Sequence, residues 1–314
     1  MKRRSLALAA LCCACASVGS ADEGGVSFWL PGFYGSFAAL PGEPGWALSG
    51  VYLHSSASAD GQLNRGLQIT LGLDATADIG VVGPTYTFES QVLGGQLSLS
   101  LLGAFGDTSV TVAATLTGPN GNTISGRRHE ELTGFGDLFP QATLKWNDGA
   151  DNYMAYLAGG VPVGAYDARR LANLGIGHGA IDIGGGYTYL NPADQLEFSA
   201  VVGLTYNFEN TDTDYQNGID AHIEWGASYL VNNNLHVGLV GYALQQVTGD
   251  SGAGAKFGDF ESRVFGAGPQ IGYTLPIGDG VQAYANLRGY GEFGAENRAE
   301  GWNVWLTIAL SRPR

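Results

Sequence analysis

The stretch Leu196-Glu-Phe-Ser-Ala-Val-Val-Gly-Leu-Thr-Tyr-Asn-Phe-Glu209 alternates apolar side chains with polar or small ones. Its even-numbered residues from Leu196 to Phe208 are all apolar, whereas the intervening positions include Glu197 and Asn207. A period of two is the pattern of a β-strand with one apolar and one polar face. The run is longer than the usual strand of about five or six residues. It is long enough for a tilted strand that crosses a membrane.

The same alternation recurs from 221 to 231, from 281 to 293 and from 302 to 310, and it is weaker elsewhere. It predicts about 12–14 strands, the range arising because the segments 78–88 and 96–105 are the weakest. The predicted strands lie at 46–56, 66–74, 78–88, 96–105, 108–117, 136–147, 152–163, 178–190, 195–209, 218–231, 235–247, 262–275, 281–293 and 302–312.

The predicted connections alternate in length along the chain. Short turns are expected at Gly106-Asp107, Asn147–Gly149, Asn191–Asp194, Asn232–Asn234 and Gly278–Gly280, where the residue types suit tight turns. Long polar loops are expected at 118–133, 164–177, 210–217 and 249–260. Short turns at one end and long loops at the other are typical of outer-membrane barrels.

Strand length and loop order decide between two all-β folds. The first is a soluble β-sandwich, in which the aromatic residues near the strand ends would pack against aromatic residues of neighbouring strands. A membrane sheet must close on itself, because lipid cannot pair with the N–H and C=O groups of an edge strand. Tyr206, Phe208, Tyr229 and Trp302 lie near the ends of apolar strand faces, as an aromatic girdle would. The sequence therefore predicts a closed antiparallel transmembrane β-barrel of the outer-membrane type.

The composition excludes several other classes of protein. Charged residues make up 14% of the 314 residues and glycine contributes 50, whereas soluble domains average about 25% charged residues and about 7% glycine. The 45% hydrophobic and 11% aromatic content argues against a disordered chain. With 15 Lys+Arg against 29 Asp+Glu, the chain lacks the basic surplus that a nucleic-acid partner requires.

The first residues have the order of an export signal. Basic residues at 2–4 precede an apolar stretch at 5–16 and small residues at 19–21. We predict a signal peptide at 1–21, which would carry away all three cysteines. No later segment offers about 18 consecutive apolar residues, so no transmembrane helix is expected. The expected location is the cell outer membrane, with membrane lipid and, during biogenesis, the barrel-insertion machinery as partners.

Two further regions follow the predicted signal peptide. Residues 46–314 would form the barrel, whereas residues 22–45 are rich in aromatic residues, proline and glycine and make poor strand material. We expect this segment to fold into the lumen as a candidate plug or gate. Its candidate gating residues are Phe28, Trp29, Phe33 and Tyr34.

Charged and polar residues share the strand face that would point into the lumen, because charge facing lipid costs several kcal/mol. The candidate pore-lining residues are Asp182, Glu197, Asp220, His222, Glu224, His236, Asn286, Arg288, Tyr290 and Glu292. They fit either a hydrated path that filters solutes or a plugged interior in which Arg288 pairs with carboxylates. Glycines at 50, 72, 184, 186, 203, 226, 238, 266, 268 and 272 are expected on the same face, where they leave space or relieve curvature.

Catalytic motifs are scarce, and we predict neither enzyme activity nor a cofactor. No histidine lies in an HExxH motif and the chain has no GxSxG elbow. A membrane-embedded hydrolase would need Ser with His on the outer wall, whereas His222 and His236 have inward parity. Asp220, His222 and Glu224 could bind a metal, but solvated side chains explain this cluster more simply, and no metal site is predicted.

Several segments of the chain carry an ordered set of motifs that together are more specific than any one of them. The first is Gly25-Val-Ser-Phe-Trp-Leu-Pro-Gly-Phe-Tyr-Gly-Ser-Phe-Ala-Ala-Leu-Pro-Gly-Glu-Pro-Gly-Trp46. The others are Gly134-Phe-Gly-Asp-Leu-Phe-Pro140, Gly241-Tyr242 with Gln246-Val-Thr-Gly-Asp250, and Asn286-Leu-Arg-Gly-Tyr290 with Asn297-Arg-Ala-Glu-Gly-Trp302. These segments resemble outer-membrane proteins of the meta-pathway phenol-degradation family. The resemblance implies a barrel that passes hydrophobic substrates across the outer membrane.

From these observations we expect an outer-membrane channel for passive uptake or efflux of small organic solutes, aromatic or hydrophobic ones among them. The alternative is a structural or surface-binding barrel without an open pore. Both share every strand feature, so the sequence leaves them open.

Overall fold

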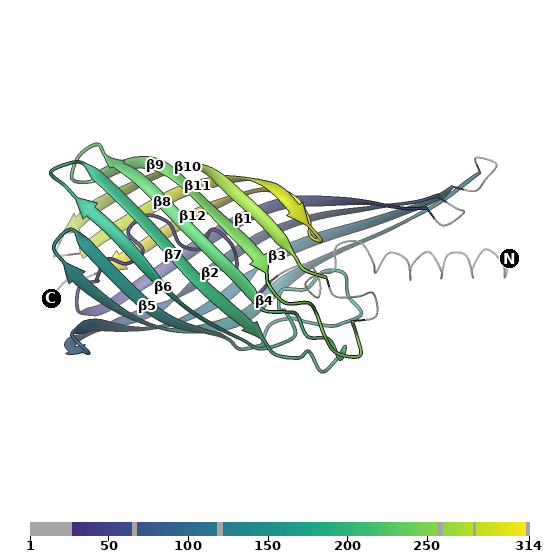
Figure 1. Ribbon diagram of the computed structural model, residues 1–314, viewed down its shortest axis with the longest axis horizontal. Coiled ribbons are helices and arrows are strands. Elements are labelled where there is room, and N and C mark those ends of the chain that lie inside the picture. Colours follow the sequence, from purple (N-terminus) through teal and green to yellow (C-terminus); the bar gives the residue numbers. More distant parts are fainter. Residues whose placement is uncertain (1–26, 65–67, 118–121, 256–259, 279–280, 312–314) are drawn as a thin grey trace.

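The structure is a computed structural model that describes residues 27–64, 68–117, 122–255, 260–278 and 281–311. The predicted signal peptide lies outside these residues. The described residues form twelve strands, each antiparallel to its chain neighbours, and β1 pairs with β12 to close the sheet. The predicted closed antiparallel barrel is therefore confirmed (Figure 1). No helix among the described residues is long and apolar enough to cross a membrane.

The strands have the following bounds: β1 Gly45–Asn64, β2 Gln68–Val92, β3 Gly95–Thr117, β4 Thr123–Asp148, β5 Asp151–Gly160, β6 Ala180–Asn191, β7 Leu196–Asn207, β8 Asp220–Leu230, β9 Leu235–Gln246, β10 Arg263–Gly278, β11 Val281–Glu296 and β12 Glu300–Ser311.

Three kinds of expectation about residues 66–133 are wrong. The segments 66–74 and 78–88 belong to the one strand β2, and 96–105 and 108–117 belong to the one strand β3. Gly106-Asp107 is therefore no turn; both residues pair with β2 inside the sheet. The expected loop 118–133 is also too long, because β4 begins at Thr123.

The cause of these errors is a change of face along continuous strands. In β3, the exposed apolar residues Leu99, Leu101 and Phe105 point outward at odd positions. Beyond them the apolar residues Val110 and Val112 occupy even positions. A shift from odd to even apolar positions resembles a break between two strands, although the backbone pairing with β2 continues across it.

The outer surface of the barrel carries the large apolar side chains. Along β7, Phe198, Val202 and Leu204 are each between 43% and 52% exposed, and β9 and β11 expose Leu239 and Leu287 in the same way. The inward residues of β7, from Glu197 to Asn207, are buried except for the partly exposed Gly203. An apolar exterior around a closed sheet is the arrangement of an outer-membrane-type β-barrel.

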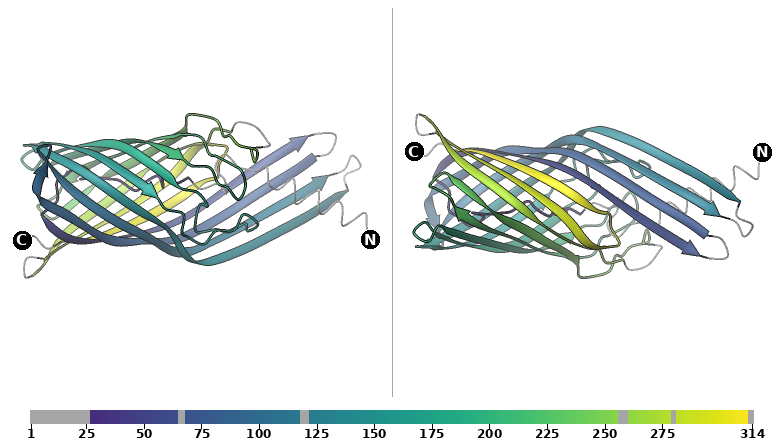
Figure 2. Two further views of the ribbon diagram at one scale, coloured as in Figure 1. Left: turned by 90° about the horizontal axis from the view of Figure 1, so that it is seen from below. Right: turned by 90° about the horizontal axis from the view of Figure 1, so that it is seen from above.

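The two ends of the barrel differ. Tight connections join β4 to β5, β6 to β7 and β8 to β9 at one end, whereas the 161–179 and 247–262 connections lie at the other. At this second end β1, β2, β3 and β4 continue beyond the remaining strands as a projecting sheet (Figures 1 and 2). In outer-membrane barrels the long loops are on the extracellular side.

The exposed position of Val202 near the middle of β7 gives a test of the lipid-facing band. Val202→Arg should lower the free energy of unfolding from lipid vesicles by about 2–4 kcal/mol, because it places a charge in the bilayer core. Ser58→Arg, on the outer face of the projecting sheet, should change it by less than about 0.5 kcal/mol. Denaturant titration followed by tryptophan fluorescence measures both, and equal losses would contradict the placement of the band.

Candidate functional site

Residues 27–44 lie inside the barrel lumen and lead into β1 at Gly45 (Figure 1). We call them the lumen segment. Side chains from β4, β6, β7, β8, β10 and β11 bond to it. The segment has no strand of its own, so its backbone groups need partners on the barrel wall. The inner wall supplies these partners through its polar residues.

The carboxylate of Glu224 on β8 binds the centre of the lumen segment. Its Oε1 accepts hydrogen bonds from the backbone N–H groups of Gly32 at 2.6 Å and Phe33 at 3.1 Å, and Oε2 accepts from Tyr34 at 2.8 Å. The indole of Trp29 adds a fourth donor at 3.3 Å. Successive N–H groups that converge on one anion form a backbone nest. Gly32 has a φ of 100°, which brings its neighbours' amides toward the carboxylate.

Trp29 packs into a buried polar cluster beside this nest. Its ring stacks on the His222 imidazole at a centroid distance of 3.9 Å. His222 Nε2 lies 3.1 Å from Asp182 Oδ2 and 3.3 Å from the Tyr156 hydroxyl. Thr205 donates to the same Asp182 oxygen. These wall residues form a flat, buried surface that fits the indole of Trp29.

Arg288 on β11 fixes the other side of the nest. Its Nη1 donates to the Phe33 carbonyl at 3.2 Å and its Nη2 donates to the Thr307 hydroxyl at 2.9 Å. The guanidinium also lies 5.8 Å from the ring centroid of Trp305. Arg288 thus binds a backbone carbonyl of the lumen segment while Glu224 binds the adjacent amides.

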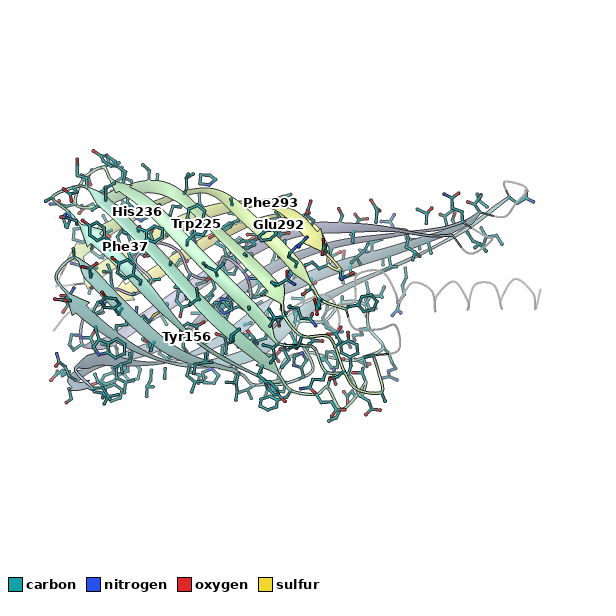
Figure 3. All side chains as sticks on the ribbon, in the orientation of Figure 1. Phe37, Tyr156, Trp225, His236, Glu292 and Phe293 are labelled. Atoms are coloured by element: carbon teal, nitrogen blue, oxygen red, sulfur yellow. The ribbon has the colours of Figure 1, made fainter. Side chains whose placement is uncertain are left out.

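The second half of the segment is bound near the short-turn end of the barrel. Glu197 accepts from the Phe37 N–H at 2.9 Å, and Lys145 donates to the Ala38 and Leu40 carbonyls at 2.8 and 3.1 Å. The Phe37 ring packs edge-on against His236, and both are labelled in Figure 3. Amides and carbonyls of the segment thus have ionic partners along much of its length.

The Tyr34 hydroxyl is a neutral contact between the segment and β4. Gln141 Nε2 donates to it at 2.6 Å. Burial raises the pKa of Tyr34 well above its usual range, and the nearby Glu224 carboxylate raises it further. The hydroxyl therefore stays protonated and adds no charge to the lumen.

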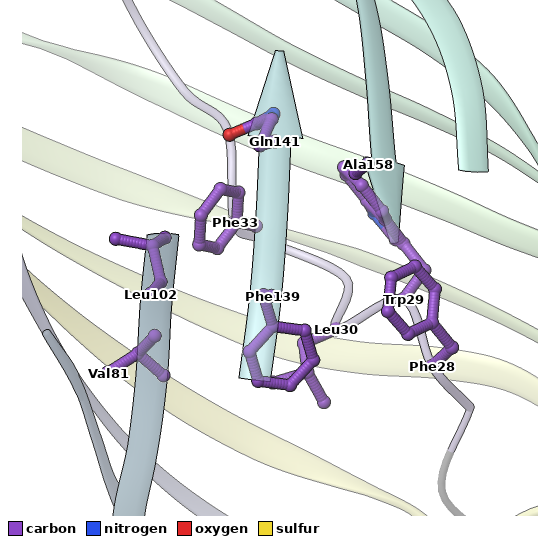
Figure 4. Close-up of a pocket in the computed structure, with 9 residues that line it drawn as sticks. All are labelled: Phe28, Trp29, Leu30, Phe33, Val81, Leu102, Phe139, Gln141 and Ala158. Atoms are coloured by element: carbon purple, nitrogen blue, oxygen red, sulfur yellow. The ribbon is translucent and has the colours of Figure 1, made fainter. Parts of the chain in front are cut away.

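An apolar cavity of about 60 Å³ separates the lumen segment from the wall formed by β2, β3, β4 and β5 (Figure 4). Its lining residues are Phe28, Trp29, Leu30, Phe33, Val81, Leu102, Phe139, Gln141 and Ala158. Eight of these nine side chains are hydrocarbon or aromatic, with Gln141 as the exception. The cavity is suited to uncharged molecules, because a charge placed there would lose its hydration without gaining a partner.

The ten candidate pore-lining residues lie on the inner side of the barrel, nine of them buried and Glu292 partly exposed. Glu197, Glu224 and Arg288 bond directly to the lumen segment, and His222 and His236 contact it through their rings. The remainder bond elsewhere on the wall: Asp220 to Asn207, Asn286 to Gln270, and Glu292 to Tyr242 and Asn303. Tyr290 packs against Tyr242 with their rings tilted by 45°.

Sequence reasoning missed several wall residues that contact the segment. Lys145 and Gln141 were within a predicted strand, and their odd-numbered parity in 136–147 would have placed both on the inner face. Tyr156 could have been found in the same way, from its alternation with the exposed Tyr153 and Leu157. The period of two was thus sufficient to identify them once the inner face was assigned.

The expected inward glycines divide into two groups. Gly184 and Gly203 face inward and make room for Tyr156, whose hydroxyl would lie 2.5 and 2.2 Å from a Cβ at these positions. The inward space therefore holds aromatic side chains. Gly50 and Gly72 were expected inward but lie on the outer face, because Gly50 has the parity of exposed Tyr52 and Gly72 neighbours Asp60.

Among the residues that the structure describes, the partners of His236 do not form the arrangement typical of a hydrolase. His236 Nδ1 lies 3.1 Å from the Ser228 hydroxyl, but its Nε2 meets the Tyr284 hydroxyl at 3.1 Å, where a triad would place a carboxylate. Within the part of the chain that the structure describes, no three His, Cys, Asp or Glu side chains gather to hold a metal ion.

Comparison with a solved outer membrane channel supports this fold. An outer membrane channel from Pseudomonas putida F1 (COG4313) superposes with a TM-score of 0.63 at 17% identity, covering 90% of this chain and 100% of its own. A Pseudomonas aeruginosa FadL homologue gives a TM-score of 0.36 at 10% identity, covering 84% and 88%. The CymD monoaromatic hydrocarbon channel gives 0.35 at 8% identity, covering 96% and 98%.

No curated protein sequence matches the chain. A family model does match it, over residues 58–308, which is most of its length. This match confirms the resemblance seen in the sequence motifs. The chain therefore belongs to the family described as "Putative MetA-pathway of phenol degradation".

Proposed function

We propose that this protein is an outer-membrane channel for passive movement of small, uncharged organic molecules, aromatic compounds among them. The observation that carries the proposal is the apolar cavity between the lumen segment and the wall of a closed, lipid-facing barrel. The family description, which refers to phenol degradation, and the P. putida structure, which is called an outer membrane channel, support it. Membrane lipid surrounds the barrel, and the barrel-insertion machinery is its expected partner during biogenesis.

The inner charges act on the lumen segment more than on solutes. Glu197, Glu224 and Arg288 are each bonded to backbone groups of the segment. Charges that are already paired in this way attract passing ions weakly. The proposed path therefore follows the apolar cavity and avoids the charged part of the wall.

In this proposal the lumen segment is a plug that closes the channel. Trp29, Phe28 and Phe33 line one side of the cavity, so a shift of the segment would widen it. Hydrogen bonds to charged groups contribute about 1.5–3 kcal/mol each, and Glu224 accepts four. Glu224 is the strongest single attachment of the plug, with Arg288 and Lys145 as further ones.

A structural or surface-binding barrel is the second candidate. The observation that favours it is that residues 27–44 occupy the lumen, with Phe28 and Trp29 among the buried residues. Such a protein would show neither conductance steps nor solute uptake, whereas a plugged channel would show both once the plug is released.

If the lumen segment is a plug, substitution of one inward glutamate should open the channel and substitution of another should not. Glu224→Ala should raise the open-to-closed ratio about a hundredfold, because the plug loses at least about 3 kcal/mol of attachment. Glu292→Ala is the matched control, since Glu292 bonds to Tyr242 and Asn303 and not to the plug. Planar-bilayer recording of the refolded proteins measures open probability. Identical traces from the two variants would contradict the plug.

The solute class is tested in intact Gram-negative cells, whose lipopolysaccharide leaflet slows the entry of hydrophobic molecules. Cells that produce the protein should take up radiolabelled toluene or phenol several times faster than cells with an empty vector. Uptake of benzoate, which is charged at neutral pH, should not change. No acceleration for any of the three, from a folded and inserted protein, would favour the structural barrel.

A further inference from the structure

The projecting sheet formed by the ends of β1, β2, β3 and β4 reverses the polarity of the barrel wall. We call this part of the sheet the extension, meaning residues 53–64, 68–79, 106–117 and 123–134. Below it the outer face is apolar, as Tyr52, Val82 and Phe135 show by their exposure of 43%, 55% and 73%. Within the extension the outer face becomes polar. This change marks the level at which the wall leaves the membrane.

Acidic residues define the outer face of the extension. Register pairs Asp78 on β2 with Asp107 on β3, and Asp60 and Asp74 share the same face. Each of these carboxylates would be costly in contact with lipid tails. The outer face of the extension therefore lies in water or among headgroups and sugars, beyond the hydrocarbon core.

The inner face of the extension is apolar over the same length. On β2 it carries the partly exposed Leu73 and Ile79, and on β3 it carries Val110 and Val112, with Leu73 and Val112 directly paired. The described inner-facing positions on β1, β2 and β3 of the extension include no charged residue. A sheet with both faces in water would ordinarily carry no continuous apolar surface on either face. An apolar face turned toward the pore axis needs an apolar occupant.

Continuity with the cavity identifies that occupant. Val81 is the next inward residue after Ile79 on β2, and Val81 lines the cavity beside Phe28 and Leu102. The apolar surface thus runs without a charged interruption from the extension into the cavity. On the β4 side it is bordered by Arg128 and Glu130, which bond to each other and to the 161–179 loop.

We propose that the inner face of the extension is a capture surface for uncharged, hydrocarbon-rich solutes of monoaromatic size, which it delivers to the cavity. The inference rests on the proposed channel function and deepens it by assigning the entry route and the solute class. Burial of apolar area drives binding along the face, and the absence of hydrogen-bonding anchors keeps each contact weak enough for movement. Charged solutes gain nothing on this surface.

One test uses a matched pair of substitutions on β2. Leu73→Lys places a charge on the inner face, whereas Thr76→Lys places the same charge on the outer face between Asp74 and Asp78. At limiting toluene concentration, Leu73→Lys should lower the initial uptake rate of intact cells about tenfold, and Thr76→Lys should leave it unchanged. Leu73→Ser with Val112→Ser should give a smaller decrease in the same direction. Heat-modifiable gel mobility verifies that each barrel is folded.

A second measurement detects binding of toluene to the inner face of the extension and does not depend on transport. The chain beyond the predicted signal peptide has no cysteine, so Leu73→Cys or Thr76→Cys can carry a single polarity-sensitive fluorophore. Toluene should shift the emission of the label at position 73 and leave that at position 76 unchanged. Equal responses at both positions, or equal uptake by the two lysine variants, would overturn the capture surface.

Two further outcomes distinguish failure of the capture surface from failure of the proposed channel function. If the unaltered protein gives no uptake above empty-vector cells, the proposed function fails, and the fluorophore at position 73 still decides whether the face binds toluene. If Leu73→Lys dissociates a dimer in light scattering while uptake is unchanged, a second copy of the chain covers the face. That result would overturn the capture surface and retain the channel.

Discussion

Pairing of every backbone N–H and C=O group that faces lipid is the constraint on which this structure depends. Pairing of β1 with β12 closes the sheet and satisfies this constraint. The closed sheet has an outer and an inner face, and each residue faces lipid, the lumen or water according to its face and its height on the barrel. Within the membrane the apolar face points outward and the charges point inward. On the ends of β1 to β4, which project beyond the other strands (Figure 2), the two faces exchange and the apolar face turns inward.

The inward charges create a second requirement, because a buried carboxylate or guanidinium needs partners. Residues 27–44 supply them with their own backbone. Glu224 and Arg288 bind adjacent peptide groups of one short segment, and Glu197 and Lys145 bind the next. The same contacts that satisfy the wall therefore hold this segment in the lumen and leave an apolar cavity along β2 to β5. In the proposed channel, this cavity is the space for a solute and the segment is the part that moves.

Local alternation was enough to predict most of the barrel. The segments 195–209, 218–231 and 235–247 match β7, β8 and β9 closely, because each keeps one apolar face throughout. The method failed in β2 and β3, where Asp78 and Asp107 stand at the exchange of faces and the apolar parity shifts within one strand. Parity also placed Glu224 and Arg288 inward, but their partners in residues 27–44 have no periodicity. The nest around Glu224 depends on the tertiary path and on the φ of Gly32.

The most direct measurement is a reversible covalent lock on the segment. The hydroxyls of Ser36 and Ser228 lie 2.9 Å apart, across the contact between the segment and β8, and no cysteine lies outside the predicted signal peptide. In the double variant S36C with S228C, a disulfide should hold the segment in place, so that conductance and toluene uptake are low when oxidised and recover on reduction. Equal conductance and uptake in the two redox states, with the disulfide verified by mass spectrometry, would show that movement of residues 27–44 does not control the channel.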